Sequence, residues 1–450
     1  NNISSLWLSK YSGPDQDSIR HEHFAHLDPY YHSKVYFENI SNIKSVVMNP
    51  ARYGNGREEY GEDWSYCESN SFYRPESYLG YYTGEYLAKD IQHVSNSLET
   101  LVAKDSKFDS GCQSMEYFNV PEQMNSLKNL DLTNNEIYVF SSSGTTSLEE
   151  LRLSGNNIGK PKAGSWVNDP GYPNIQTSMK IFNSSSSSGN FLNLKLLDLS
   201  HNDIIDFGGS SFQYTNIENL NVSDNPRLGN NQMLPITCPF LKYLNMSNSS
   251  LKKGLKLRDA LELKSIIIEN SNLYRLSVAT DTDLDTFKNL ETLIIGSSNP
   301  FCDTINLRYG YEPTSNADWQ DTTIGGSYSE YGYSAYNLKT LDVSKCPNLK
   351  NLFLPRASDQ FSGIEKKYLS LININNTRLG REGNLDSFFF SGPEFNPDNY
   401  PEGHVLEVFA NNVRDLANGP CVLSMSDYLR LLTRWDDQGK TLIIYTDSIS

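Results

Sequence analysis

Apolar residues recur along the chain in a fixed frame, with aliphatic residues at the first, fourth and sixth positions and a small residue at the ninth. The first clear copy has Leu127, Leu130, Leu132 and Asn135 at these positions. Nine copies follow the frame, and they begin at Leu127, Leu148, Leu194, Ile217, Leu241, Leu263, Leu290, Leu338 and Leu369. Every aliphatic position holds Leu, Ile, Val or Met, so we expect the repetition to govern the fold.

The middle of each copy alternates between apolar and polar residues with a period of two, which is typical of a strand with one buried face. Start-to-start spacings include 21, 23, 24, 22 and 27 residues, which suits one supersecondary unit per copy. Because one such strand cannot bury its apolar face alone, we predict that the copies stack into a parallel sheet over one core. The predicted fold class is an α/β solenoid, with loops or short helical turns on the side away from the sheet.

The ninth position predicts a ladder of buried turns. Asn fills it at Asn135, Asn156, Asn202 and Asn225. An Asn side chain can bond the backbone groups that a tight turn would otherwise leave buried and unpaired. Later copies have Ser249, Ser271, Ser298, Cys346 and Thr377 at this position. These side chains can bond fewer groups, so we expect a looser ladder in the C-terminal half.

The frame resembles that of the leucine-rich repeat proteins. The segment Leu341–Leu354 is similar to the short, Asp- and Ser-rich repeats of bacterial surface proteins, particularly from Bacteroidetes, and Leu197–Ser200 has the common Leu-Asp-Leu-Ser spelling. The resemblance covers residues 127–380. It implies a horseshoe with a concave parallel sheet and a convex side of loops and short helices. It also implies a secreted or surface-anchored binding protein, and it supplies no catalytic residues.

The repeats divide the chain into three predicted regions. Residues 1–126 form irregular early repeats and a cap with insertions, 127–392 form the repeat array, and 393–450 form a C-terminal cap. Weak copies of the frame occur at Ile3–Leu8, Ile40–Val46, Leu98–Ala103, Leu385–Phe390 and Val405–Ala410. In the C-terminal cap we predict a helix over Met425–Trp435, with Leu429, Leu432 and Trp435 on one side, and a strand over Thr441–Tyr445.

Composition and charge exclude some partners. The chain has 54 acidic and 38 basic residues, and its net charge is −16. That charge argues against a protein that neutralises nucleic-acid phosphates or docks on an anionic membrane. No run of 18 apolar residues occurs, so no membrane span is predicted. Aromatic residues make up 12% of the chain, which indicates a folded protein.

The compartment is predicted to be extracellular or at the cell surface. The chain begins at Asn1 without Met, and the sequence leaves open whether a signal peptide or a lipid anchor precedes it. Six cysteines are too few for a disulfide scaffold. Cys67 could pair with Cys112 and Cys302 with a neighbour, whereas most of the six are expected to be buried free thiols.

The polar residues that point outward from the predicted strands form the first candidate site, a concave binding face for a protein or peptide. The candidates are Asp131, Arg152, Asp198, Asn221, Asn245, Glu269, Asp342 and Phe353. Phe353 is assigned to this face from an extra half-copy at Leu349–Leu354. The alternative is a solvated sheet face whose Asp and Ser residues only reflect the repeat.

Two long insertions interrupt the period, at about 159–191 and 299–337. Loops of this length are uncommon unless they have a function. The second insertion contains the candidate contact residues Tyr309, Tyr311, Trp319, Tyr328, Tyr331 and Tyr333. Aromatic rings stack on sugars and anchor protein interfaces. The alternative is that these rings cover the flank of the solenoid.

Metal and catalytic signals are weak. His21, His23 and His26 could ligate a metal, although a polar surface turn also accounts for them. Asp281–Asp285 resembles the start of a calcium loop but lacks the required Gly and Glu. No nucleophile elbow, phosphate loop or dinucleotide motif occurs.

The prediction is therefore a non-catalytic, monomeric binding protein without cofactor or metal. Its first expected partner is a protein or peptide. The alternatives are a glycan-binding protein that uses the aromatic insertions and a structural adhesion component.

Overall fold

The computed structural model describes part of the chain in each of two compact units, Asn1–Leu220 and Asn221–Ser450. The described residues are 5–8, 45–48, 98–104, 117–120, 125–135, 137, 139–142, 147–160, 192–207, 216–230, 234–258, 260–273, 276–279, 289–296, 304–306, 323–326, 337–344, 346–353, 368–380, 385–391, 395–415, 417–447 and 449. The predicted boundaries at 126 and 392 stay a prediction, since the division into units falls within the repeat array.

In the N-terminal unit, the strands of the repeats form an all-parallel sheet, which we call the first sheet. Its strands, in sheet order, are β1 (Ser5–Leu8), β2 (Ser45–Met48), β3 (Thr100–Ala103), β5 (Asn129–Asp131), β7 (Glu150–Arg152) and β8 (Leu196–Asp198). A separate parallel pair is formed by β4 (Tyr117–Val120) and β6 (Val139–Ser142). The unit is thus built from parallel strands that follow the repeat.

The weak N-terminal copies also join the first sheet, with one change of register. Leu6 and Leu101 both lie opposite Val46. Val46 therefore occupies the fourth position of the frame, whose first and sixth positions are Ile43 and Met48. The prediction that this copy begins at Ile40 is wrong by three residues, because the irregular spacing of its aliphatic residues admits both registers.

In the C-terminal unit, the first sheet is again all parallel and open. Its strands, in sheet order, are β11 (Tyr243–Asn245), β13 (Ser265–Ile267), β15 (Thr292–Ile294), β18 (Thr340–Asp342), β20 (Leu371–Asn373), β21 (Val405–Phe409) and β22 (Thr441–Tyr445). β9 (Asn219–Asn221) crosses the boundary between the units. β21 corresponds to the predicted weak copy at 405–410, and the strand predicted at 441–445 is confirmed as β22.

The predicted alternation of buried and exposed residues is confirmed in these strands. Most of the three-residue strands have a buried central residue between two partly exposed ones. Leu151, Leu197 and Leu293 are fully buried. Burial of one such side chain stabilises the fold by about 1.5–3 kcal/mol. The repeated leucines therefore form the core, and the flanking residues form what we call the outward face of the first sheet.

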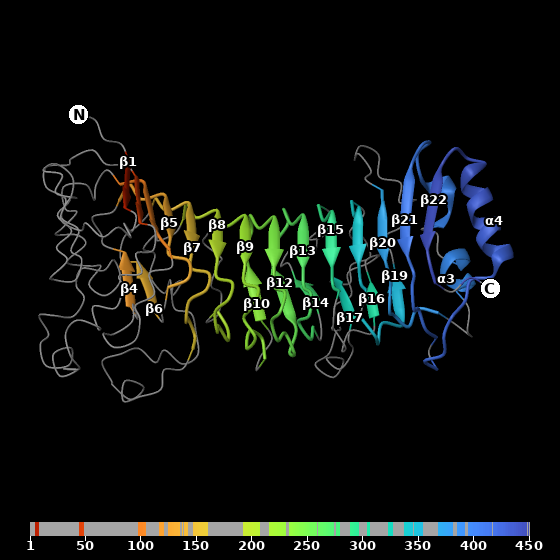
Figure 1. Cartoon of the computed structure of the whole chain (residues 1–450), viewed down its shortest axis with the longest axis horizontal. Helices are drawn as coiled ribbons and strands as arrows, with labels where there is room; N and C mark the ends of the chain where they lie inside the picture. Colours follow the sequence, from red (N-terminus) through yellow and green to blue (C-terminus); the bar gives the residue numbers. More distant parts are fainter. Residues whose placement is uncertain are drawn as a thin grey trace, which may run out of the picture. The chain divides into compact units, whose positions relative to one another are not determined.

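A second parallel sheet in the C-terminal unit differs from the prediction of loops or short helices. Its strands, in sheet order, are β10 (Leu234–Thr237), β12 (Leu255–Arg258), β14 (Leu276–Ala279), β17 (Thr323–Gly326), β16 (Thr304–Asn306) and β19 (Asn351–Phe353). Each repeat from β11 to β18 thus has a strand in both sheets (Figure 1). The alternation of Leu255 and Leu257, both fully buried, is the local reason for strands on this side.

Part of the insertion at 299–337 belongs to the second sheet. β16 and β17 both come from this insertion, and they lie between β14 and β19. In the first sheet, β15 pairs directly with β18. Between β14 and β19 the second sheet has two strands, β17 and β16, whereas between β13 and β18 the first sheet has β15 alone. The insertion is therefore not only a loop.

The described helices lie outside the nine repeats. They are α3 (Asp386–Ser391), the 3₁₀ helix η6 (Pro397–Asn399) and α4 (Met425–Asp436). α3 replaces the weak repeat copy predicted at Leu385–Phe390, so that prediction is wrong. Phe389 donates a backbone hydrogen bond to Leu385, and both side chains are buried. Their spacing of four residues suits a helix as well as the repeat frame.

The helix predicted over Met425–Trp435 is confirmed as α4, but its predicted inner face is only partly right. The N-cap Ser424 accepts a hydrogen bond from the Asp427 backbone at 3.1 Å, which sets the start of the helix. Leu431 and Trp435 are buried, and the Trp435 indole donates to the Phe395 carbonyl at 3.1 Å. Leu429 is 53% exposed. The buried stripe thus passes through Leu431 instead of Leu429.

Candidate functional site

Most of the candidate face residues lie on or beside strands of the first sheet. Asp131, Arg152 and Asp198 are aligned on β5, β7 and β8 of the N-terminal unit. In the C-terminal unit, the corresponding row of aligned residues is Asn245, Ile267, Ile294, Asp342, Asn373, Phe409 and Tyr445. Asn221 ends β9, and Glu269 follows β13 by two residues.

Phe353 does not share this face. It belongs to β19 of the second sheet, where its backbone lies opposite Asn306 of β16. The half-copy Leu349–Leu354 follows the repeat frame in its apolar residues, but it forms the strand on the other side of the repeat. Two sheets with the same period of alternation cannot be told apart by that period, so the assignment of Phe353 to the concave face is wrong.

The acidic candidates have a structural role at the ends of their strands. Asp131 Oδ1 accepts hydrogen bonds from the Thr133 backbone at 3.1 Å and the Thr133 hydroxyl at 2.6 Å. Asp198 Oδ1 does the same with Ser200, at 3.0 and 2.7 Å. Such bonds from a residue to the backbone two positions on form an Asx turn. The Asp-x-Ser/Thr pattern in the sequence is the signal for this turn.

The same bond recurs in the C-terminal unit. The side-chain oxygens of Asn221, Asn245, Asp342 and Asn373 accept from the backbone two residues on, at 3.2, 3.1, 2.8 and 3.2 Å. The three carboxylates differ in whether their second oxygen, Oδ2, already has a partner. Asp131 Oδ2 pairs with Lys104 at 2.8 Å, and Asp342 Oδ2 accepts from Asn373 Nδ2 at 3.0 Å. Asp198 Oδ2 has no partner among the described residues.

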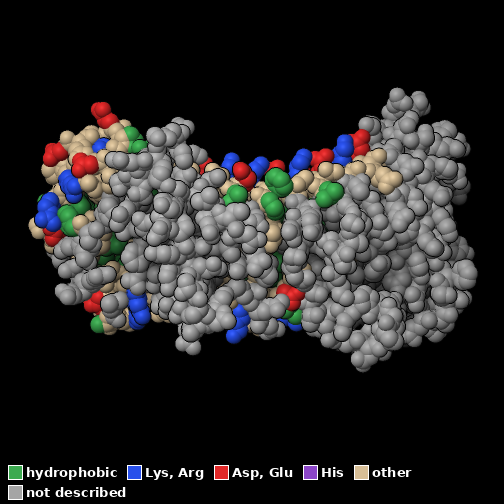
Figure 2. Space-filling model, turned by 180° about the vertical axis from the view of Figure 1, so that it is seen from behind, with side chains coloured by type: hydrophobic (Ala, Val, Ile, Leu, Met, Phe, Trp, Pro, Cys, Tyr) green, Lys and Arg blue, Asp and Glu red, His purple; other side chains and the backbone are tan. Residues whose placement is uncertain are grey.

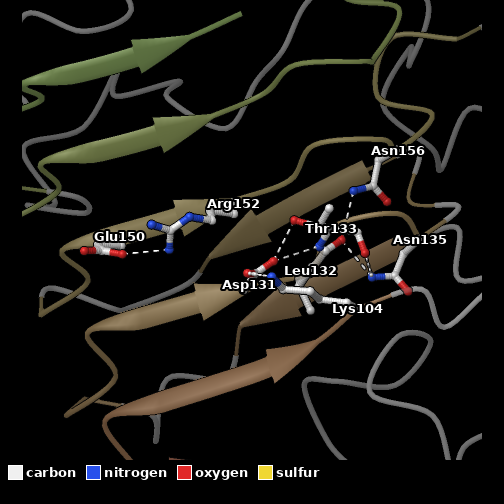
Figure 3. A network of polar contacts seen from close by, with 8 residues as sticks. All are labelled: Lys104, Asp131, Leu132, Thr133, Asn135, Glu150, Arg152 and Asn156. Carbon is white, nitrogen blue, oxygen red and sulfur yellow. Dashed lines mark hydrogen bonds and ion pairs between the residues drawn. The ribbon is translucent and has the colours of Figure 1, made fainter. Parts of the chain in front are cut away.

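Figure 3 shows how closely these polar groups are connected in the N-terminal unit. The Asp131 turn lies between Lys104 and the buried asparagines Asn135 and Asn156. Arg152 extends away from this cluster and donates to Glu150 at 2.7 Å. Arg152 is therefore held by a residue of its own strand and remains part of the outward face.

The four predicted ladder asparagines bond backbone groups within and between turns. Asn156 Nδ2 donates to the Leu132 and Leu153 carbonyls at 3.0 and 2.9 Å, while its Oδ1 accepts from Ile137 at 3.1 Å. Asn202 repeats this arrangement one turn later. Asn135 and Asn225 donate to carbonyls of their own turns. The ladder therefore joins successive repeats through groups that the turn would otherwise bury unpaired.

The later ladder positions use smaller groups. Ser271 Oγ lies 2.8 Å from both the Met246 and the Glu269 carbonyl oxygens, to which its hydroxyl can donate. Thr377 Oγ1 donates to the Ile374 carbonyl at 2.8 Å. Ser249 Oγ is buried with no partner among the described residues. Cys346 Sγ donates to the Ile295 carbonyl at 2.8 Å. Burial, with a contribution from Asp342, raises the pKa of the Cys346 thiol to about 12, which keeps it a donor.

A second column of asparagines was not predicted. The residue just before the ladder position has a positive φ in many turns. These residues are Asn134, His201, Asp224, Asn248, Asn270, Asn376 and Asn412. In the C-terminal unit, Asn248 donates to Asp224 at 2.8 Å and Asn270 donates to Asn248 at 3.0 Å. The signal is the recurrence of Asn, Asp and Gly at the eighth position, because these residues tolerate left-handed backbone.

Charged residues of both signs also recur at the second position of the frame. Lys128 pairs with Glu99, Lys195 with Glu149 and Lys339 with Glu291, each at 3.0 Å. Figure 2 shows acidic and basic side chains interspersed along the edge of one face. Exposed pairs of this kind contribute about 0–1 kcal/mol each. Their balanced signs leave no strongly charged patch along this row.

The row of aligned outward residues in the first sheet ends with two aromatic rings. Phe409 and Tyr445 lie opposite each other on β21 and β22, with ring centroids 4.4 Å apart and planes at 13°. Tyr445 is 42% exposed. Sequence reasoning identified both strands but not this pair, although the alternation places both rings on the outward face.

The other predicted sites lie outside the described residues. These are the insertion aromatics Tyr309, Tyr311, Trp319, Tyr328, Tyr331 and Tyr333, the histidines His21, His23 and His26, and the segment Asp281–Asp285. Within the described part of the chain, no group of three or more His, Cys, Asp or Glu residues could hold a metal ion. The three described cysteines, Cys238, Cys346 and Cys421, are buried free thiols.

No helix of the described segments is long and apolar enough to span a membrane. No protein-family model matches the chain, and no curated protein is significantly similar to it.

Proposed function

We propose that the chain is a leucine-rich repeat protein that binds a protein or peptide partner, outside the cell or at its surface, and has no catalytic activity. The repeat frame and the alternation of its parallel strands support the proposed fold. The resemblance to bacterial surface repeats supports the compartment. The outward face of the first sheet is the proposed binding surface.

One observation carries the proposal. Ile267 and Ile294 lie opposite each other on the outward face of β13 and β15, and Tyr243 of β11 lies diagonally beside them, opposite Ser265. Tyr243 is 47% exposed, and the nearby Phe240 is also exposed. Aromatic and aliphatic anchors on a rigid sheet are typical of the centre of a protein interface. Neighbouring strands lie about 4.8 Å apart, so one partner can contact all three side chains.

The Asx turns change which residues we assign to binding. Asp131, Asn245 and Asp342 stabilise the strand ends, so their replacement would alter the fold as well as the face. Tyr243, Ile267 and Ile294 form no such turn, and they are the better contact residues. Asp198 and Arg152 remain candidates because part of each side chain is available to a partner.

Affinity capture tests the proposal with single charged substitutions. We expect Ile267→Asp or Ile294→Asp to abolish capture of the protein partner from cells or their medium, because a buried unpaired charge opposes docking. Leu429→Asp is the matched control, since Leu429 is exposed on α4, outside the face. Capture that is unaffected by both face substitutions, or that Leu429→Asp disrupts equally, would contradict the proposal.

A further inference from the structure

Phe409 and Tyr445, like Ile267 and Ile294 in the same row, stand where other repeats have an Asp or Asn that forms an Asx turn. In the same row, Asp342 and Asn373 accept the backbone hydrogen bond two residues on. An aromatic side chain cannot accept this bond. At β21, the Asn411 backbone instead donates to Asn375 Oδ1 of the preceding turn, at 2.6 Å. This position therefore has no Asx turn, and it holds a partly exposed Phe409 beside an exposed Tyr445.

The pair presents aromatic surface at the end of the first sheet. β22 is the terminal strand of the sheet order. Because the two planes differ by only 13°, one face of each ring is covered by the other. Tyr445 is 42% exposed, so the remaining aromatic surface is open to solvent. An aromatic face is electron-rich, and it attracts the weakly positive C–H groups of a flat ligand such as a sugar ring.

Polar groups flank the pair along β21. Glu407 lies two residues before Phe409 on β21, so it shares the outward face at about 7 Å along the strand. Asn411 lies in the turn that directly follows the strand. Both residues are partly exposed. The Glu407 carboxylate and the Asn411 side-chain amide have no partner among the described residues. Together they offer acceptors and donors to hydroxyl groups at both ends of a ligand on the rings.

The charge of this region restricts the ligand. The outward positions of β20, β21 and β22 and of the residues just after them are Leu371, Asn373, Asn375, Val405, Glu407, Phe409, Asn411, Thr441, Ile443, Tyr445 and Asp447. None of them is Lys or Arg, whereas Glu407 and Asp447 are acidic. Such a surface repels sulfated or carboxylated polysaccharides and accepts uncharged ones.

We propose that Phe409, Tyr445, Glu407 and Asn411 form a subsite for a neutral saccharide, in which Tyr445 stacks on the sugar, Phe409 supports the Tyr445 ring and the polar groups bond the sugar hydroxyls. This inference goes beyond the proposed protein-binding function and does not depend on it. The two surfaces use different strands of the first sheet, so each can be tested without the other.

Titration calorimetry with cellohexaose, chitohexaose and maltohexaose tests the subsite in the full chain, with polygalacturonate as the acidic comparator. We expect at least one neutral hexamer to bind and polygalacturonate not to bind. Tyr445→Ala should weaken binding by about tenfold or more, which corresponds to about 1.4 kcal/mol. Tyr445→Phe keeps the ring and should change the affinity by less than about threefold. Glu407→Gln should weaken binding several-fold without removing a ring.

Leu429→Ala is the control, because it removes an exposed apolar side chain from α4 of the same unit, outside both proposed surfaces, and we expect unchanged saccharide affinity. Binding of no neutral hexamer overturns the inference, and so does equal binding by the wild type and Tyr445→Ala. If Tyr445→Ala does not fold, Glu407→Gln decides, and an unchanged affinity in that variant overturns the subsite. Loss of protein capture in Ile267→Asp with intact saccharide binding would leave both proposals standing.

Discussion

At the scale of single residues, the repeat depends on whether each buried polar atom has a partner. The ladder position shows both outcomes in neighbouring turns of the C-terminal unit. Ser271 Oγ contacts two carbonyls and also accepts from the Ser249 backbone at 3.3 Å. Ser249 Oγ is buried without a partner among the described residues. The two serines occupy equivalent positions, so they form a natural matched pair.

We expect Ser249→Ala to leave the free energy of unfolding unchanged or to raise it by up to about 1 kcal/mol, because it removes a buried unpaired hydroxyl. Ser271→Ala should lower it by about 1–3 kcal/mol, since it removes the hydroxyl that bonds the Met246 carbonyl and the Ser249 backbone N–H. Urea unfolding followed by circular dichroism measures both. Equal destabilisation by the two substitutions would show that the hydrogen bonds of Ser271 are not the cause.

Gly380 is a second residue whose environment has consequences for stability, because its neighbours leave no room for a side chain. A Cβ at this position would lie 2.1 Å from Cys421 Sγ and 3.0 Å from Cys421 Cβ. Gly380→Ala should therefore lower the free energy of unfolding by about 1–3 kcal/mol. Cys421→Ala removes the sulfur, so the double variant should lose less stability than the sum of the two single variants. Strict additivity in the same urea measurement would rule out this clash.

At the scale of elements, α4 has two apolar stripes, and only one of them is buried. Leu431 and Trp435 pack inward and the Trp435 indole is hydrogen-bonded. Leu429 and Met425 lie on the exposed side. The segment that follows the helix contacts η6, since Gln438 donates to Asp398 at 2.5 Å. This bond is the largest contribution to a lowered pKa of the exposed Asp398 carboxyl.

We expect Leu431→Ala to lower the free energy of unfolding by about 2–5 kcal/mol, because it leaves a cavity under α4. Leu429→Ala, on the same helix with the same change of side chain, should alter it by less than about 0.5 kcal/mol. Thermal unfolding compares the two. The reverse order would mean that the outer stripe of α4 is the packed one.

At the scale of the whole molecule, the chain has a net charge of −16, yet among the described residues we trace a pH effect near neutrality to the half-buried His404. His404 stacks on Tyr400 with centroids 4.7 Å apart, and its Nε2 is 2.7 Å from the Leu369 carbonyl. Burial is the main cause that lowers the pKa of His404, and Lys440 lowers it further. The folded state therefore favours the neutral ring.

This lowered pKa predicts an acid-sensitive fold. Below the unfolded-state pKa of about 6.5, the unfolded chain binds a proton that the folded chain excludes. The stability contribution of neutral His404 is thus present above pH 6.5 and is lost progressively as the pH falls. His404→Gln should flatten the dependence of the free energy of unfolding on pH between 7 and 5. An unchanged slope in this variant would exclude His404 as the cause.

The sequence alone was enough to predict the strands of the array. The alternation in segments such as Leu127–Leu132 is local information, and the buried leucines of those strands follow from it directly. The role of the ladder asparagines could also be predicted, because a small amide at a fixed place in a tight turn mainly serves to bond the backbone of that turn. The repeat spacing then required stacking, since no single copy could bury its apolar face.

Other features depended on the tertiary structure, because local patterns admit more than one neighbour. The alternation in Leu349–Leu354 fits either sheet, so only the pairing of β19 with β16 placed Phe353. Asp131 and Asp198 are read from the sequence as exposed carboxylates, but the fold turns one oxygen of each toward its own backbone. Leu429 and Leu431 are both apolar, and the surface packed beneath α4 selected Leu431. The aromatic pair exists only because β21 and β22 pair in register, which brings two rings 36 residues apart into contact.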